Sequence, residues 1–306
     1  MRGRTLPLLL AVGLDLAFGE PRSRWHPVAG FGRGLRWLEG RQERRTASRG
    51  IGALLAGLGA SWALGWATGG VARRLGWKGV LLEAVALKAA FSARGLREAG
   101  DAVRAALDAG RLDEARRLVG WHLVSRPVEG LSAAQVTSAT VESVAENLTD
   151  SVVAPLACYA LWGLPGAWAY RALNTADAMW GYRDPCYERF GKAAARLDDL
   201  VNLLPARLAA GMLAAGAHLA GEDGRAALQV MRRDNGATAS PNAGWTMAAM
   251  AGALGVSLEK PGAYRLGDGA LPDSPVVIRR ALRVFAAATA LAVGAAVGLA
   301  LTRGRR

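Results

Sequence analysis

Val141-Glu-Ser-Val-Ala-Glu-Asn-Leu-Thr-Asp150, followed by Ser-Val-Val-Ala-Pro155, is the stretch around which the rest of the chain is organised. At 100° per residue, a helix here places Glu142, Glu146 and Asp150 on one face and gathers the apolar residues on the other. Like charges four residues apart destabilise a helix by roughly 0.2–0.5 kcal/mol per pair, and the stretch contains no Lys or Arg. The pattern predicts either a solvated acidic face or carboxylates that hold Mg²⁺.

The next segment, residues 152–173, is largely apolar but is interrupted by Gly163-Leu-Pro-Gly166. Each half is too short to cross about 30 Å of hydrocarbon. Irregular backbone at membrane depth is tolerated where protein or water covers it. We therefore expect a re-entrant or broken helix, which returns the polar loop 174–199 to the side of the membrane that carries residues 142–150.

Three other apolar runs indicate a membrane protein. Ile51 to Ala72 and Ala281 to Leu301 are long enough to span a bilayer. Leu6 to Leu14 resembles a signal peptide, but no small-residue cleavage site follows, so we expect a retained, membrane-inserted helix. Asp15, at the end of this run, is an ionisable group inside an apolar segment and indicates function, with a nearby Arg as its expected partner.

Between these runs, Ser92 to Val119 alternates charged residues with Ala and Leu at helical spacing. The segment predicts a soluble-facing helical hairpin, about residues 92–130, with a break near Gly110. No run alternates as a strand would. The sequence as a whole predicts an all-α, polytopic integral membrane helical bundle that forms a single domain over residues 1–306, with a broken helix and polar site loops.

Composition and charge restrict the classes of function that the chain can have. The chain has 38 Lys and Arg against 25 Asp and Glu, a formal charge of +13, and 52% hydrophobic residues, which excludes global disorder. No zinc spacing or RNA-binding signature accompanies the positive charge, so we expect no nucleic-acid partner. Two isolated cysteines give neither a disulfide framework nor a metal site.

Polar residues recur in the second half of the chain. They are Asn174, Asp177, Arg196, Asp198, Asp199, Asn202 and Arg207. A structural ion pair would explain Arg196 and one aspartate, but it would not explain the second aspartate and Asn202 equally well. Further on, Ser240-Pro-Asn242 followed by Gly244 predicts a turn at a helix start, whose side chains and backbone amides could cradle an anion.

Read together, these blocks resemble the adenosylcobinamide-phosphate synthase family of cobalamin biosynthesis (CobD/CbiB). The matching stretches follow the family's order and cover nearly the whole chain. They are Leu14-Asp-Leu16, Gly19-Glu-Pro21, His26-Pro-Val28, Glu142-Ser-Val-Ala-Glu-Asn147 with Asp150, Ala154-Pro-Leu156, Ala169-Tyr-Arg-Ala172, Asn174-Thr-Ala-Asp177, Ala195-Arg-Leu-Asp-Asp199, Pro205-Ala-Arg207, Ser240-Pro-Asn-Ala-Gly-Trp245 and Ala249-Met-Ala-Gly-Ala-Leu-Gly255.

The resemblance also has departures. This chain carries Arg126-Pro127-Val128 where family members usually carry Arg-Asp-Thr, and Thr246-Met247 where they usually carry Pro-Glu. Ser151 replaces a usual Gly.

The resemblance implies an ATP- and Mg²⁺-dependent ligase in the cell inner membrane, with its active site facing the cytoplasm. Such an enzyme joins (R)-1-amino-2-propanol or its O-phosphate to the carboxylate of adenosylcobyric acid. The implied catalytic residues are Glu142, Glu146, Asp150, Asp177 and Asp199. The implied metal ligands are Glu142, Glu146, Asp150, Asp198 and Asp199. The implied substrate-binding residues are His26, Asn147, Asn174, Arg196, Asn202, Arg207, Ser240 and Asn242, while Asp15 and Glu20 would lie at the mouth of the site.

This chemistry suits the residue types. Amide synthesis from a carboxylate needs phosphoryl activation, which arginines and Mg²⁺ neutralise, and an oriented amine. No Gly-x4-Gly-Lys-Ser/Thr motif is present, so a P-loop is excluded. Two other classes also place polar residues in membrane helices: a transporter with a midplane site, and a non-catalytic scaffold for corrinoid enzymes.

Overall fold

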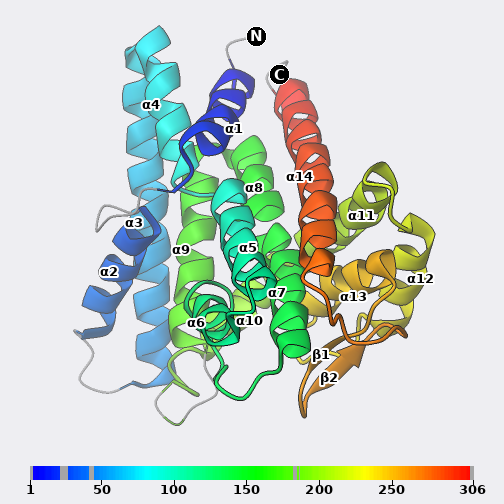
Figure 1. Cartoon of the computed structure of the whole chain (residues 1–306). Helices are drawn as coiled ribbons and strands as arrows, with labels where there is room; N and C mark the ends of the chain where they lie inside the picture. Colours follow the sequence, from blue (N-terminus) through cyan, green and yellow to red (C-terminus); the bar gives the residue numbers. More distant parts are fainter. Residues whose placement is uncertain (1–2, 21–26, 41–44, 182–184, 186, 304–306) are drawn as a thin grey trace. The chain divides into compact units, whose positions relative to one another are not determined.

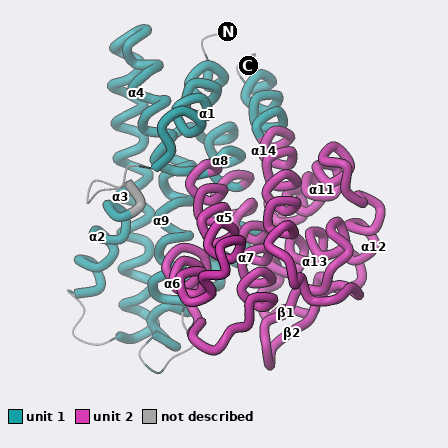
Figure 2. Tube along the Cα trace, viewed as in Figure 1, with its two compact units in different colours: residues 1–92, 154–202, 293–306 teal, residues 93–153, 203–292 magenta. Residues whose placement is uncertain are grey.

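The structure is a computed structural model that describes all residues except 1–2, 21–26, 41–44, 182–184, 186 and 304–306. It is mostly helical (Figure 1). The chain divides into two compact units, each assembled from separate segments (Figure 2). Unit 1 comprises residues 1–92, 154–202 and 293–306, and unit 2 comprises residues 93–153 and 203–292.

Unit 1 is built around a long apolar helix. Its helices are α1 (Thr5–Phe18), α2 (Pro27–Gly40), α3 (Ala47–Arg74), α4 (Trp77–Lys88), α8 (Ala154–Trp162), α9 (Leu164–Trp180), α10 (Lys192–Val201) and the end of α14 (Val276–Arg303). Thr46 caps α3 by accepting a hydrogen bond from the Arg49 backbone N–H. Helix α3 packs against α9, α10, α2 and α4.

Glycines let α3 approach its neighbours closely, as their abundance in this run predicts. A Cβ on Gly65 would lie 2.8 Å from the backbone nitrogen of Pro165, at the start of α9. A Cβ on Gly50 would lie 2.0 Å from the carbonyl oxygen of Phe190. The core that results is completed by Leu54, Trp180 and other apolar side chains of α2, α3, α9 and α10.

The predicted break in the apolar segment 152–173 is present. Helix α8 ends at Trp162, Gly163 adopts φ = 72°, and α9 begins with Pro165 in its first turn. Pro is suited to the first turn of a helix because its missing N–H would have no partner there. The two helices pack against each other within unit 1.

Among the described residues, Lys88 is an ion-pair partner of Asp15, for which the sequence predicted a nearby arginine. Lys88, at the end of α4, lies 3.0 Å from a carboxylate oxygen of Asp15 and 2.5 Å from one of Glu20. Asp15 is buried, with 1% of its surface exposed. Lysine reaches this position because α1 and α4 pack side by side, and its flexible stem lets one ammonium serve two carboxylates.

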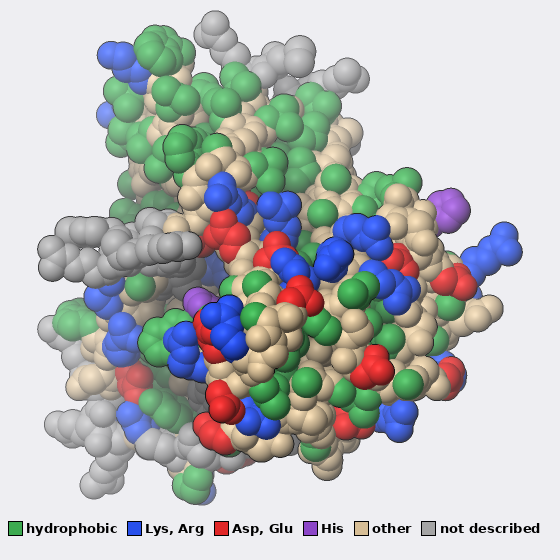
Figure 3. Space-filling view, in the orientation of Figure 1, with side chains coloured by type: hydrophobic (Ala, Val, Ile, Leu, Met, Phe, Trp, Pro, Cys, Tyr) green, Lys and Arg blue, Asp and Glu red, His purple; other side chains and the backbone are tan. Residues whose placement is uncertain are grey.

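Within the described ranges, two helices are long and apolar enough to cross a membrane, α3 and α14. Both coincide with runs that the sequence predicted as spans. The 14-residue α1 is apolar but short, because 14 residues rise only about 21 Å. Figure 3 shows hydrophobic side chains over the upper ends of α3 and α4, where Trp66, Val71 and Trp77 are exposed.

Unit 2 surrounds a helix that is buried on nearly every side. Its elements are α5 (Ala93–Asp108), α6 (Leu112–His122), α7 (Ala133–Leu148), the π-helix η1 (Thr149–Val153), α11 (Leu203–Leu219), α12 (Gly224–Asp234), α13 (Ala243–Leu254), β1 (Leu258–Lys260), β2 (Tyr264–Leu266) and most of α14. Helix α13 is apolar all round, the pattern of a core helix, and every residue in it except Trp245 is buried. Helices α7, α11 and α12 pack against it.

Two local features of unit 2 bear on the sequence predictions. The helices α5 and α6 pack together and turn at Gly110, which has φ = 70°, so the predicted break lies where it was expected. The all-α prediction, however, omitted the antiparallel hairpin β1–β2, in which Lys260 pairs with Tyr264. Three-residue strands are too short to show the alternation by which strands are recognised.

Candidate functional site

The residues predicted to form the site belong to both units. Unit 2 carries Glu142, Glu146, Asn147, Asp150, Arg207, Ser240 and Asn242. Unit 1 carries Asn174, Asp177, Arg196, Asp198, Asp199 and Asn202. His26, also predicted to bind substrate, lies outside the described residues.

In unit 2, the acidic stretch forms the second half of α7. The helix begins with a capping box, in which the Ser132 side chain and Gln135 satisfy each other's backbone N–H groups. The apolar face predicted from the pattern is buried at Val141, Val144 and Leu148. The N-terminal cap therefore determines where α7 begins, and its buried apolar face determines its orientation. This orientation sets the direction in which the acidic side chains point.

Glu142 is a buried carboxylate held by two donors. Only 5% of its surface is exposed. The Ser138 hydroxyl, one turn earlier on α7, donates to Oε1 at 2.7 Å, and the Tyr264 hydroxyl donates to Oε2 at 2.8 Å. Arg126 Nη2 lies 3.8 Å from Oε2. A solvated acidic face does not describe Glu142.

The environment of Glu142 changes its acidity. Burial raises the pKa of its carboxyl above the ordinary value of 4.5, while the bonds from Ser138 and Tyr264 and the charge of Arg126 act in the opposite direction. Burial, followed by the charge of Glu142, also raises the pKa of the Tyr264 hydroxyl. The hydroxyl therefore stays protonated and acts as a donor to the carboxylate.

Glu146 and Asn147 continue the helix beyond Glu142. Glu146 is exposed, whereas Asn147 is half-buried. The Asn147 side-chain amide donates to the Ser143 carbonyl at 3.0 Å and to its hydroxyl at 3.2 Å. In this arrangement the amide of Asn147 stabilises its own helix turn.

Asp150 departs from the predicted spacing. It lies in the π-helix Thr149–Val153, which links α7 to α8, so the assumption of 100° per residue holds only as far as Leu148. A π-helical turn has hydrogen bonds from i to i+5 and is frequently found at functional sites. The sequence gives no signal for this change of winding.

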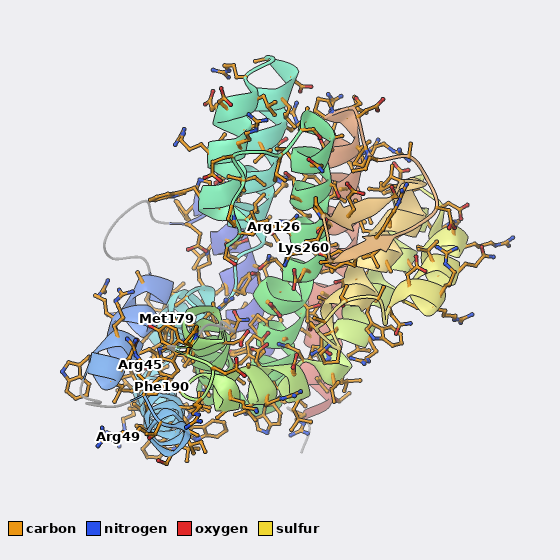
Figure 4. The ribbon with its side chains drawn as sticks, turned by 90° about the horizontal axis from the view of Figure 1, so that it is seen from below. Arg45, Arg49, Arg126, Met179, Phe190 and Lys260 are labelled. Carbon is orange, nitrogen blue, oxygen red and sulfur yellow. The ribbon has the colours of Figure 1, made fainter. Side chains whose placement is uncertain are left out.

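A polar pocket of about 170 Å³ opens onto this face of α7. Glu142 and Glu146 line it from α7, Arg126 from the loop after α6, and Lys260 and Tyr264 from the β-hairpin. Figure 4 shows Arg126 and Lys260 beside each other. The pocket thus combines two carboxylates, two cations and a phenol hydroxyl.

A second polar cluster of unit 2 lies at the start of α13. Arg207 donates to the Asn242 side-chain oxygen at 2.7 Å and to the Pro241 carbonyl at 3.2 Å, and its guanidinium lies over the Trp245 ring. The Ser240 hydroxyl accepts a hydrogen bond from the Asn242 backbone N–H at 3.2 Å. Arg207 therefore fixes the Ser-Pro-Asn turn, which the sequence offered as a cradle for an anion.

In unit 1, the side chain of Asn202 is buried and makes two hydrogen bonds. It accepts a hydrogen bond from the Tyr170 hydroxyl at 3.0 Å and donates one to Asp198 at 2.9 Å. Asn174 accepts from Arg171, which also donates to the Ala90 carbonyl. These bonds tie α9 to α10 and to the end of α4.

The remaining predicted residues of unit 1 are more accessible. Asp177, at the end of α9, and Asp199, on α10, are half-buried, and Arg196 is exposed. Among the described residues, no hydrogen bond or ion pair joins Arg196 to a carboxylate. The ion pair that the sequence offered as an explanation of Arg196 is not formed in the described part of the chain.

The described acidic side chains contain no group of three or more His, Cys, Asp or Glu that could hold a metal ion. The carboxylate oxygens of Glu142 already accept hydrogen bonds from Ser138 and Tyr264. The described residues thus do not form an all-protein cage for Mg²⁺. They are compatible with the arrangement in which Mg²⁺ is bound by substrate phosphates, waters and one or two carboxylates.

Sequence reasoning missed three residues that line the polar pocket. Arg126 stood in a stretch noted only for its departure from the family pattern, and Lys260 and Tyr264 lie in the hairpin that was not predicted. The Tyr264 hydroxyl also lies 3.7 Å from the sulfur of Met247, which is another position where the chain departs from the usual family sequence. Rarity was the only available signal for Lys260, since the chain has four lysines.

The fold and the pocket together define a mostly helical protein with two potential membrane spans among its described helices and a mixed-charge site in its second unit. Comparison with protein-family models identifies the family to which the chain belongs. The CobD/Cbib protein family model matches residues 8–293, and the chain belongs to this family.

Named relatives cover most of the chain. It is 39% identical to the cobalamin biosynthesis protein CobD of Rhizobium meliloti (strain 1021) over 284 residues, which is 89% of this chain and 86% of the relative. It is 36% identical to the CobD protein of Klebsiella pneumoniae subsp. pneumoniae over 302 residues, 94% of each chain. A probable CobD protein of Methanothermobacter thermautotrophicus is 40% identical over 266 residues, 85% of this chain and 86% of the relative. No solved structure matches the chain.

Proposed function

We propose that this protein is an ATP-dependent amide-forming ligase of cobalamin biosynthesis. It attaches (R)-1-amino-2-propanol or its O-phosphate to the carboxylate of adenosylcobyric acid, giving adenosylcobinamide or its phosphate. Membership of the CobD/Cbib family over nearly the whole chain supports the pathway. The apolar helices α3 and α14 support a place in the cell inner membrane, where we propose that the site faces the cytoplasm.

The observation that carries the reaction type is the buried carboxylate of Glu142 beside Glu146 in the polar pocket. An aliphatic amine is protonated at neutral pH and attacks a carbonyl only after it has lost that proton. A carboxylate whose pKa is raised by burial is a better proton acceptor than an ordinary one. In this proposal Glu146 binds the ammonium at the pocket mouth and Glu142 accepts its proton.

The other partner, a corrinoid carboxylate, resists attack by an amine. ATP, which would carry Mg²⁺ on its phosphates, transfers its terminal phosphoryl group to the carboxylate and leaves as ADP. The deprotonated amine then attacks the acyl phosphate and displaces inorganic phosphate, which forms the amide. Asp150, Asp177, Asp198 and Asp199 are the candidates for one or two metal contacts. Arg196 and Arg207, with Asn147, Asn174, Asn202 and the Ser240–Asn242 turn, are candidates for positioning substrates.

Product analysis tests this proposal. Purified protein in detergent is incubated with adenosylcobyric acid, Mg²⁺-ATP and either amine, and products are identified by mass spectrometry. An amide that forms only with ATP is the expected result. A folded protein that binds the corrinoid but forms no amide with either amine would contradict it and would favour a transporter or a scaffold.

A further inference from the structure

An apolar groove in unit 1 contains none of the residues assigned to the proposed reaction. Its volume is about 500 Å³, and it lies between α2, α3 and α9, which pack against one another (Figure 1). Apart from Ser61, its lining side chains are Gly, Ala, Leu, Phe and Trp. Gly34 and Trp37 on α2 and Ala56 and Ala60 on α3 are exposed, so the groove opens at the surface of the unit. We call it the α2–α3 groove.

The lining of the α2–α3 groove favours an apolar ligand. Phe31 and Trp168, whose rings pack edge to face with centroids 6.1 Å apart, form part of it. The described residues that line the groove include no Asp, Glu, Lys, Arg or His. A charged or strongly polar molecule would therefore lose its hydration in the groove without gaining partners, which is costly. An apolar molecule would instead gain from leaving water.

The position of the groove along α3 indicates which apolar molecule reaches it. Helix α3 is one of the described helices that are long and apolar enough to cross a membrane. Its 28 residues rise about 42 Å, which exceeds the roughly 30 Å of hydrocarbon in a bilayer by about eight residues. The α3 residues of the groove lie between Ala56 and Leu64. They are therefore within the hydrocarbon whichever end of α3 projects from it, and acyl chains are their neighbours.

Helix α2 marks the level of the membrane interface beside the groove. It is amphipathic, with Leu35 buried and Arg33 and Arg36 exposed. Helices of this type lie in the interface, with the apolar face buried roughly 5–10 Å into the acyl boundary, and an exposed Trp such as Trp37 is typical of this level. Leu35 packs on α3, since a Cβ on Gly57 would lie 2.9 Å from its side chain. The groove thus extends from the headgroup level into the hydrocarbon.

We propose that the α2–α3 groove binds one acyl chain of an anionic phospholipid, and that Arg33 and Arg36 contact the phosphate of its headgroup. Guanidinium groups form charge-assisted, often bidentate hydrogen bonds with phosphate oxygens. Arginines near a bilayer surface also favour anionic over neutral lipids. The bound lipid joins α2 to α3 and is distinct from the substrates of the proposed reaction. Lipid binding can therefore be measured whether or not the protein forms an amide.

Direct lipid binding tests the groove. The full-length protein in detergent is titrated with palmitoyl-oleoyl phosphatidylglycerol, and the lipids bound to each chain are counted by native mass spectrometry. In Gly34→Leu the new side chain fills part of the groove, and a Cβ at this position meets nothing within 4 Å. We expect the first lipid to bind this variant at least about tenfold more weakly than the wild type, because displacing two methylene groups changes the affinity by about that factor.

The chain offers matched controls on α3. A Cβ on Gly59 also meets nothing within 4 Å, and Gly59 is exposed but does not line the groove. Gly59→Leu should therefore bind lipid as the wild type does. Ala60→Leu inside the groove and Ala63→Leu outside it form a second pair in which no glycine is changed. Only Ala60→Leu should weaken binding, and unfolding temperatures show whether each variant is folded.

The headgroup contact is tested with phosphatidylcholine that carries the same acyl chains. The wild type should prefer phosphatidylglycerol. Arg33→Gln and Arg36→Gln should each reduce that preference roughly fivefold, which corresponds to about 1 kcal/mol for one arginine near a membrane surface. Arg225→Gln changes an exposed arginine of α12 in unit 2 and should leave the preference unchanged.

Four results would overturn the assignment. Equal lipid affinity of Gly34→Leu, Ala60→Leu and the wild type would show that the groove does not hold the lipid. A change from dimer to monomer in Gly34→Leu, with lipid binding unchanged, would assign the groove to a second copy of the chain. Loss of adenosylcobyric acid binding in Gly34→Leu, again with lipid binding unchanged, would assign it to the corrinoid. Equal affinity of the wild type for the two lipids would refute the contact of Arg33 and Arg36 with the headgroup.

Discussion

Tyr264 donates a hydrogen bond to the carboxylate of Glu142 at 2.8 Å. The two residues are separated by 122 positions in the sequence, and the bond joins the β-hairpin to α7. It places a buried acid, a phenol and the cations Arg126 and Lys260 around one pocket. The proposed chemistry depends on this arrangement, because it sets both the position and the acidity of Glu142.

Replacing Tyr264 with Phe removes this bond while it keeps the aromatic ring. The bond is one of the influences that lower the pKa of Glu142, so its loss should raise that pKa further, and the acidic limb of the pH–rate profile should move to higher pH. We expect a loss of stability of about 1–3 kcal/mol. If the pH–rate profile of the variant is identical to that of the wild type, Tyr264 does not influence the reaction.

Glu142→Gln tests the buried charge through stability. The folded carboxyl has a pKa above 4.5, so the native state binds a proton more readily than the unfolded chain. This contribution to stability is fully present below pH 4.5 and is lost as the pH rises through the raised pKa. Unfolding temperatures measured between about pH 4 and about pH 8 should fall more for the wild type than for Glu142→Gln. Parallel curves would show that Glu142 does not have a raised pKa.

Lys88→Met tests the ion cluster of unit 1. The substitution leaves Asp15, which is 1% exposed, without its lysine partner. Loss of one partner of a buried pair costs about 3–5 kcal/mol, so the unfolding temperature should fall sharply. The double variant Asp15→Asn, Lys88→Met should recover much of the loss. If the double variant is no more stable than Lys88→Met, the pairing is not what makes Lys88 important.

Gly65→Ala tests the contact between α3 and α9. The added methyl would lie 2.8 Å from the Pro165 nitrogen, and overpacking of this kind costs about 1–3 kcal/mol. Gly59→Ala on the same helix is the control, because a Cβ there meets nothing within 4 Å. It should be neutral or slightly stabilising, since Ala favours helix over Gly by about 1 kcal/mol. Equal effects of the two variants would contradict this packing.

Much of the helical architecture could be predicted from local pattern. The runs that became α3 and α14 had both the length and the composition of spans. Gly110 and Gly163 indicated the breaks in the sequence, because Gly adopts positive φ at little cost. Both residues have positive φ in the structure. The apolar face of α7 followed from its periodicity.

The composition of the pocket could not be predicted in this way. Arg126, Glu142 and Tyr264 come from three separate elements, and no spacing rule connects them. Helical periodicity assigned Glu142 and Glu146 to one face, but it did not show that the first is buried and the second exposed. That difference depends on the β-hairpin covering one end of the face.

Asp150 illustrates a different limit. Its predicted alignment with Glu146 assumed regular α-helical winding, and the π-helix begins at Thr149. A π-turn depends on how the helix is packed, so a pattern based on 3.6 residues per turn cannot reveal it.

The most direct test of the central claim compares amide formation by the wild type, Glu146→Gln and Glu98→Gln in one assay with adenosylcobyric acid, Mg²⁺-ATP and aminopropanol O-phosphate. Glu98 is an exposed carboxylate of the same unit, paired with Arg94 on α5, and serves as the control. We predict ATP-dependent product from the wild type and from Glu98→Gln. Glu146→Gln, folded and still able to bind the corrinoid, should give none. Product from Glu146→Gln at the wild-type rate would contradict the assignment of the pocket as the site of amide synthesis.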